Sequence, residues 1–268
     1  MKKLFLISVA LLVEQGHAQE PNRTEIVNVN GIELYYEQYG KGEPLLLLHG
    51  WTQSSQFWSE YISTYAQSYE VYAVDLRGHG KTTPLTEDFS IQKSAKDIIA
   101  LMDYLSLKRV KAIGLSYGGL VLLQIGDLLP DRLESVILIG ASHNYSGGDN
   151  QALDNQFSFE DLPPSFVEQL RGLHPQGDQQ IKALFNPGLN YEIRLKDEDL
   201  RAVRTRTLII NGDRDEILGV DAALALHKHL PDSELWIVPN SGHIPIGGTN
   251  KSQFLDISIE FLNRKKAK

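Results

Sequence analysis

The sequence predicts an α/β fold in which helices cover both faces of a doubly wound, mostly parallel β-sheet. Short apolar runs recur along the chain, which is typical of strands that are buried on both faces. Amphipathic helical patterns lie between these runs. With 268 residues, 42% of them hydrophobic and 22% charged, the chain has the size and composition of one globular α/β domain.

The expected elements alternate along the chain. An extended segment at 32–39 precedes apolar runs at 44–48, 71–74, 110–113, 136–139, 207–210 and 235–238. Helical patterns occupy 90–105, 120–129, 222–230 and 253–262. This alternation predicts parallel strands that are joined by right-handed crossovers.

One segment interrupts the alternation. Residues 141–201 contain no buried-strand signal, are rich in polar residues, glycine and proline, and have short helical pieces at 164–173 and 179–185. A structureless loop of this length is uncommon inside a compact domain. We therefore expect a small helical lid, inserted after the strand that follows the helix at 120–129. The core would then consist of residues 19–140 and 202–268.

The first 18 residues resemble a secretory signal peptide. A basic start at 1–3 precedes an apolar run at 4–13, and Gly16 and Ala18 place small residues before a cleavage site after Ala18. The run is too short to span a bilayer, which needs roughly 20 residues. We expect an exported protein, periplasmic or secreted, without membrane insertion after cleavage; an uncleaved anchor is the alternative.

Charge and cysteine content exclude several classes of protein. The chain has 26 Lys and Arg against 34 Asp and Glu, a net charge of -8, so it is poorly suited to bind a nucleic-acid backbone. It has no cysteine, which excludes disulfides, thiolate metal sites and a cysteine nucleophile. The expected partner is a small molecule, and the sequence does not specify an oligomeric state.

A serine flanked by glycines follows the run at 110–113. In Gly114-Leu115-Ser116-Tyr117-Gly118-Gly119, glycines on both sides of Ser116 would allow a strand and a helix to approach closely. Such a turn presents the serine hydroxyl as a nucleophile. The N–H of Tyr117, at the start of the helix, could bind a developing oxyanion. A glycine-rich turn with a capping serine is the competing interpretation.

A second oxyanion donor is expected after the run at 44–48. His49-Gly50-Trp51 follows that run directly, so the N–H of Trp51 could act together with that of Tyr117. His49 itself is expected to hold the loop by hydrogen bonds.

A serine nucleophile needs a base, and the base needs an orienting acid. His243 follows the run at 235–238, and both Asp213 and Asp215 follow the run at 207–210. These positions lie at the carboxyl ends of predicted strands, where ligands bind in open α/β sheets. The remaining histidines of the fold are expected to be structural or solvated: His79, His143, His174, His227 and His229.

Together these motifs resemble the α/β-hydrolase family. The resemblance covers residues 26–264 and rests on the following motifs: His49-Gly50-Trp51, Asp75-x-Arg77-Gly78-x-Gly80, Gly114-x-Ser116-x-Gly118-Gly119, Gly212-x-x-Asp215 and Gly242-His243. It implies a lidded serine esterase in which Asp215, three residues after the glycine that ends its strand, is the acid. Asp213 would then hold the loop. The implied reaction is hydrolysis of a carboxylic ester through an acyl-enzyme, with no metal and no organic cofactor.

Several chemistries of the same fold stay open. Haloalkane dehalogenases and epoxide hydrolases are excluded, because they carry a carboxylate nucleophile where this chain has Ser116. C–C bond hydrolases, lactonases, perhydrolases and prolyl aminopeptidases are alternatives, as is a non-catalytic small-molecule binding module. The signal peptide argues against an intracellular C–C hydrolase. The physiological substrate and its acyl chain length are not specified by the sequence.

Overall fold

The computed structural model describes residues 19–146, 159–186 and 188–264. Its centre is an eight-stranded sheet with the order β1-β2-β4-β3-β5-β6-β9-β10. The strands are β1 (Arg23–Val29), β2 (Ile32–Gly40), β3 (Glu43–Leu48), β4 (Tyr69–Val74), β5 (Val110–Leu115), β6 (Leu133–Ile139), β9 (Arg206–Gly212) and β10 (Ser233–Val238). The six strands from β4 to β10 in this order pair in parallel, and β1 and β2 are antiparallel. The predicted mostly parallel sheet is therefore confirmed.

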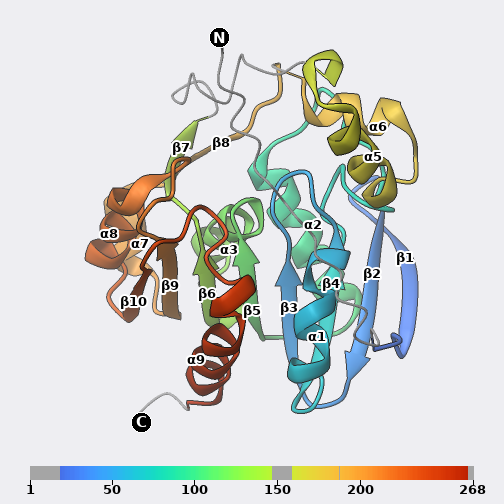
Figure 1. The fold of residues 1–268 in the computed structure, drawn as a ribbon. Helices are drawn as coiled ribbons and strands as arrows, with labels where there is room; N and C mark the ends of the chain where they lie inside the picture. Colours follow the sequence, from blue (N-terminus) through green and yellow to red (C-terminus); the bar gives the residue numbers. More distant parts are fainter. Residues whose placement is uncertain (1–18, 147–158, 187, 265–268) are drawn as a thin grey trace.

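Helices cover both faces of the sheet (Figure 1). One face packs against α2 (Ile91–Tyr104), α3 (Tyr117–Leu128) and α8 (Gly219–His229), and the other against α1 (Ser59–Tyr65) and α9 (Lys251–Asn263). Both faces need to be covered, because successive side chains of a buried strand such as β3 point to opposite faces of the sheet. In β3, Leu46 and Leu48 pack in the core on the side of α2, α3 and α8, whereas Leu45 and Leu47 pack in the core on the side of α1 and α9.

The strand order reverses beside β3 and β5. From β3 the chain runs to β4 on one side, and from β5 it continues toward β10 on the other side. In open α/β sheets, ligands bind outside the carboxyl ends of the strands at such a reversal. The topology therefore indicates that a ligand-binding site lies at the loops after β3 and β5.

The insert combines helices with a small sheet. It contains α5 (Pro164–Leu173), α6 (Asp178–Leu184) and α7 (Asp197–Ala202), together with β7 (Asn144–Ser146) and β8 (Glu192–Arg194), which pair as antiparallel strands. The helical pieces expected at 164–173 and 179–185 are thus present as α5 and α6. The expected helical lid did not include this small sheet, because three-residue strands are too short to leave a periodic pattern.

The insert is docked on the main sheet. Figure 1 shows α5 and α6 at the upper end of the sheet, beyond the strands. The amide of Gln180 on α6 donates to the carbonyl of Gly80 at 2.8 Å, and the indole N–H of Trp51 donates to the carbonyl of Leu184 at 3.1 Å. The insert therefore rests on the loops that follow β3 and β4.

Outside the insert, the sequence does not predict strand β1 or helix α1. The edge strand β1 was missed because its sequence RTEIVNV is mostly polar and only two of its residues are buried. Helix α1 was missed because seven residues are too few to establish a helical period.

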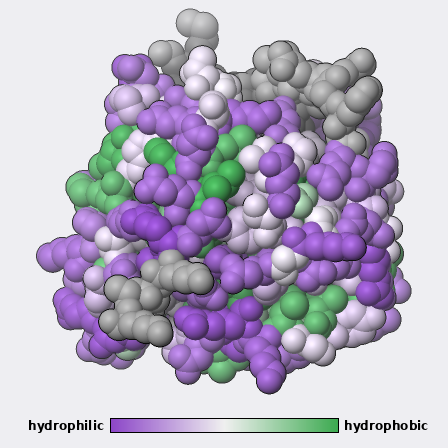
Figure 2. All heavy atoms as spheres, turned by 90° about the horizontal axis from the view of Figure 1, so that it is seen from below, coloured by the Kyte–Doolittle hydropathy of each residue, from purple (hydrophilic) through white to green (hydrophobic). Residues whose placement is uncertain are grey.

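The end of the molecule opposite the insert is largely hydrophilic, with apolar side chains in a few separate groups (Figure 2). Within the described part of the chain, no helix is both long and apolar enough to cross a bilayer. The predicted signal peptide, residues 1–18, lies outside the described residues.

Candidate active site

Ser116 occupies a strained turn between β5 and α3. Its φ of 48° and ψ of -110° lie in a region that residues other than glycine rarely adopt. Such a conformation costs on the order of 1–3 kcal/mol and persists only where the surroundings impose it. The N–H of Ser116 donates to the carbonyl of Ile139 on the neighbouring strand β6 at 2.7 Å, which helps to hold the turn.

The glycines beside Ser116 are required by close backbone contacts. A Cβ atom on Gly114 would lie 2.6 Å from the carbonyl carbon of Gly118, and one on Gly118 would lie 2.6 Å from the carbonyl carbon of Leu48. Real Cβ atoms do not approach backbone this closely. The turn therefore has the geometry that its glycine spacing predicts.

The loop after β3 lies against the start of α3. The N–H of Gly118 donates to the carbonyl of His49 at 3.0 Å, and the rings of Trp51 and Tyr117 are 5.1 Å apart. In the described part of the chain, neither the backbone N–H of Trp51 nor that of Tyr117 has a hydrogen-bond acceptor. Both predicted oxyanion donors are therefore available to a ligand.

His49 holds this loop in place. Its Nε2 accepts a hydrogen bond from the N–H of Leu76 at 3.0 Å, and its Nδ1 lies 2.7 Å from the carbonyl of Gly50. Burial lowers the pKa of His49 to about 4, so the ring is neutral at physiological pH. This is the structural role that the sequence predicted for it.

The loops after β9 and β10 bring His243 and Asp215 together. His243 Nδ1 is 2.9 Å from Asp215 Oδ2, and the carboxylate also accepts from the N–H groups of Ile217 and Leu218. Burial by itself raises the pKa of Asp215, but the hydrogen bond and charge of His243 and the two N–H groups outweigh it and lower that pKa. An ionised carboxylate can only accept, so Nδ1–H is the donor in this contact, and Nε2 points away from Asp215.

Asp213 does not reach this histidine. It is exposed, and its carboxylate accepts a hydrogen bond from the backbone N–H of Ser241 at 3.1 Å. It thus ties the loop after β9 to the loop after β10, which is the role that the sequence predicted for it.

Ser116 and His243 both lie near the end of β6. Ser116 is bonded to Ile139, and a Cβ atom on the next residue, Gly140, would lie 3.0 Å from His243 Cε1. The two side chains are not hydrogen-bonded to each other in this structure. Ser116 is partly exposed, whereas His243 is buried with 7% of its surface exposed.

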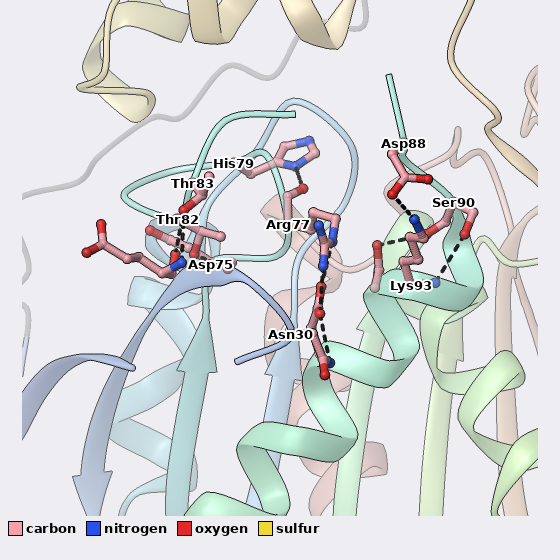
Figure 3. A network of polar contacts seen from close by, with 12 residues as sticks. Asn30, Asp75, Arg77, His79, Thr82, Thr83, Asp88, Ser90 and Lys93 are labelled. Carbon is pink, nitrogen blue, oxygen red and sulfur yellow. Dashed lines mark hydrogen bonds and ion pairs between the residues drawn. The ribbon is translucent and has the colours of Figure 1, made fainter. Parts of the chain in front are cut away.

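The loop that follows β4 is built by the motif Asp75-x-Arg77-Gly78-x-Gly80 (Figure 3). The buried carboxylate of Asp75 accepts from the N–H groups of Ser55 and Lys81 at 2.7 and 2.8 Å. Arg77 binds the buried Asp97 on α2 through two hydrogen bonds of 2.7 and 2.8 Å. This motif therefore shapes the loop rather than supplying reactive groups.

The other histidines lie away from the reacting groups or are held in neutral form. His174 accepts from the N–H of Gly80 at 2.9 Å and contacts the carbonyl of Thr52, and burial lowers its pKa to about 4. His79 is buried with a strongly lowered pKa, caused first by burial. His143 and His229 face Asp197 at 3.3 and 3.4 Å, and the exposed His227 faces the hydroxyl of Ser233.

One residue near Ser116 was missed by the sequence reasoning. Tyr191, directly before β8, packs its ring edge-on against Trp51, with 4.6 Å between ring centroids. No sequence signal could have found it, because it lies in the irregular insert and belongs to no motif.

The chain is similar to several known proteins. A family model described as "alpha/beta hydrolase fold" matches residues 43–174. The chain is 26% identical to a non-heme chloroperoxidase from Kitasatospora aureofaciens, over 88% of this chain and 98% of that protein. It is also 26% identical to a pimeloyl-[acyl-carrier protein] methyl ester esterase from Nitrosomonas europaea, over 79% of this chain and 93% of that protein. Among solved structures it is similar to a hydrolase from Pseudomonas aeruginosa, with a TM-score of 0.77 and 18% identity, covering 91% of this chain and 99% of that one.

Proposed function

Because the chain belongs to the α/β-hydrolase family, we propose that it is a serine hydrolase that cleaves carboxylic esters through an acyl-enzyme. The observation that carries the proposal is the buried imidazole–carboxylate pair of His243 and Asp215, in a chain that also holds Ser116 in a strained turn after β5. The similarity to a methyl ester esterase supports an ester as the substrate.

In the proposed acylation, Ser116 Oγ attacks the ester carbonyl carbon and gives its proton to His243 Nε2. Asp215, hydrogen-bonded to Nδ1, stabilises the imidazolium that forms. The backbone N–H groups of Trp51 and Tyr117 bind the oxyanion of the tetrahedral intermediate. When this intermediate collapses, the C–O bond to the alcohol breaks, and the alcohol leaves with the proton from His243.

In the proposed deacylation, water takes the place of the alcohol. His243 accepts a proton from the water as its oxygen attacks the acyl carbon, and the bond to Ser116 breaks. The proton returns to Ser116 Oγ and the carboxylic acid is released. The reaction needs no metal and no organic cofactor.

The first experiment tests the nucleophile without assuming a substrate. A fluorophosphonate should react with the purified protein and add one mass equivalent at Ser116, as measured by mass spectrometry of peptides. Ser116→Ala should abolish the labelling. Ser135→Ala is the control, because Ser135 lies on the neighbouring strand β6, is buried, and its hydroxyl has no partner in the described chain. No labelling of the wild-type protein would favour the binding module.

The second experiment tests the substrate class. Short-chain p-nitrophenyl esters should be hydrolysed, and Ser116→Ala should lower kcat on the order of 10⁴-fold or more. Thioesters, lactones, prolyl anilides and peracid formation with hydrogen peroxide, assayed in parallel, would identify the other chemistries of this fold. Labelling of Ser116 without turnover of any ester would exclude the ester in favour of one of these.

Export of the protein is a further part of the proposal and rests on residues 1–18 alone. Expression of the full chain in a Gram-negative host should yield a periplasmic protein whose N-terminus follows Ala18. An uncleaved N-terminus would contradict it.

A further inference from the structure

We propose that Tyr191 is a catalytic residue, whose phenolic hydroxyl donates a hydrogen bond to the oxyanion of the tetrahedral intermediate. The proposal deepens the proposed function, because it requires Ser116 to be the nucleophile. It adds a side-chain donor from the insert to the two backbone donors of the core.

The ring of Tyr191 lies over the residues that carry the backbone donors. Its centroid is 4.6 Å from that of Trp51 and 5.9 Å from that of Tyr117, and its plane is stacked at 9° on the ring of Phe89. Trp51 is itself fixed by the hydrogen bond from its indole to Leu184. Tyr191 therefore packs against the side chains of both residues whose backbone N–H groups are the predicted oxyanion donors.

The small sheet of the insert holds Tyr191 in this position. Residue 191 directly precedes β8, and Ile193 on β8 is buried and pairs with Tyr145 on β7. The ring of Tyr145 packs edge-on against Tyr191, with centroids 5.7 Å apart. The N–H of Tyr191 also donates to the carbonyl of Leu189 at 2.9 Å. Aromatic contacts on several sides thus restrict how the ring can move.

Tyr191 also lies close enough to Ser116 for the two side chains to influence each other. Burial raises the pKa of Tyr191 well above its usual value, and a hydrogen-bonding contribution from the side chain of Ser116 opposes part of this rise. The two hydroxyls do not complete a hydrogen bond of ordinary geometry in this structure. Tyr191 is partly exposed in this structure.

The chemistry follows from this placement. In the tetrahedral intermediate the oxyanion and Ser116 Oγ are bonded to the same carbon, so they lie closer together than the two atoms of a hydrogen bond. A donor beside Oγ needs only a small shift to reach the oxyanion. Because its pKa is raised, Tyr191 keeps its proton and acts as a donor throughout, so no proton is transferred to or from it.

The test compares Tyr191→Phe with Tyr39→Phe. Both variants lose one hydroxyl, but Tyr39 lies on β2 and donates to Glu37. For Tyr191→Phe we expect a fall in kcat of about 10²-fold on a p-nitrophenyl ester, which is typical of losing one oxyanion donor, with KM changed less than about twofold. Affinity for a boronic acid that forms a tetrahedral adduct on Ser116 should weaken by a similar factor. Tyr39→Phe should keep both values.

The outcomes separate this inference from the proposed function. Wild-type kcat and boronate affinity in Tyr191→Phe, with an active parent, would overturn the role of Tyr191 alone. A rise in KM with unchanged kcat would also overturn it, because the residue would then only bind the ground state. Failure of fluorophosphonate to label Ser116 in the parent would instead overturn the proposed function. Circular dichroism and the melting temperature would show whether each variant is folded.

Discussion

A methyl group on Gly118 should disrupt the contact between strand β3 and helix α3. The Cβ atom of Gly118→Ala would lie 2.6 Å from the carbonyl carbon and 2.8 Å from the Cβ atom of Leu48, and it would overlap the carbonyl oxygen. These atoms belong to the fully buried Leu48 and cannot swing away as the end of a flexible side chain would. The helix must therefore move away from the strand.

The expected cost can be estimated from this overlap. Overpacking typically costs 1–3 kcal/mol, and a clash with backbone belongs at the upper end, so we expect about 2–3 kcal/mol. For a chain of this size that corresponds to a fall in Tm of about 5–10 °C. The movement would also pull the N–H of Gly118 from the carbonyl of His49 and displace Trp51. A shift of this kind should lower kcat on the order of 10-fold or more.

Gly126→Ala is the matched control on the same helix. A Cβ atom there would meet nothing within 4 Å, so alanine should stabilise the helix by about 0.5–1 kcal/mol through its higher propensity. Urea unfolding followed by circular dichroism, together with ester hydrolysis, measures both variants. If Gly118→Ala kept wild-type stability and activity, the close approach of β3 and α3 would be wrong. If both variants were destabilised equally, the effect would belong to the helix and not to the contact.

Further predictions concern the acid and the effect of pH. Asp215→Asn should lower kcat on the order of 10⁴-fold, whereas Asp213→Asn should retain near wild-type kcat, because only Asp215 is bonded to His243; equal losses in the two variants would contradict this assignment. The pKa values of His49 and His174 are lowered to about 4, so between pH 6.5 and 4 the unfolded chain binds protons that the folded chain does not, and stability falls as the pH falls. From pH 7 to 5.5 this loss should be about 1 kcal/mol for each histidine, and an unchanged urea midpoint over that range would show that these rings are not held neutral.

Much of the fold could be predicted from local patterns. The strands from β3 to β10 leave apolar runs because both of their faces are covered, and α2 leaves an amphipathic pattern because only one of its faces is buried. The edge strand β1 and the strands of the insert have no such constraint, so their sequences do not reveal them. The insert was therefore predicted with its main helices but without its sheet.

Some features of the candidate site could likewise be predicted from local patterns, whereas others could not. Ser116, His243 and the two aspartates were found because each stands next to a strand end that the sequence reveals. The choice between Asp213 and Asp215 rested on a spacing known from similar proteins. Only the paths of the two loops show that Asp215 faces the imidazole while Asp213 caps a turn.

By itself the sequence determined the mostly parallel sheet, the order of its elements and the glycine-flanked serine, because these depend on burial patterns and on space within a few residues. The tertiary structure determines which carboxylate contacts His243, which backbone N–H groups near Ser116 lack an acceptor in the described chain, and which side chain of the insert lies near Ser116. These contacts join residues that are 28 or more positions apart, and their geometry depends on the packing of whole loops. Tyr191 is an example of such a contact. Its neighbours Trp51 and Ser116 follow two different strands, and no local sequence pattern connects the three residues.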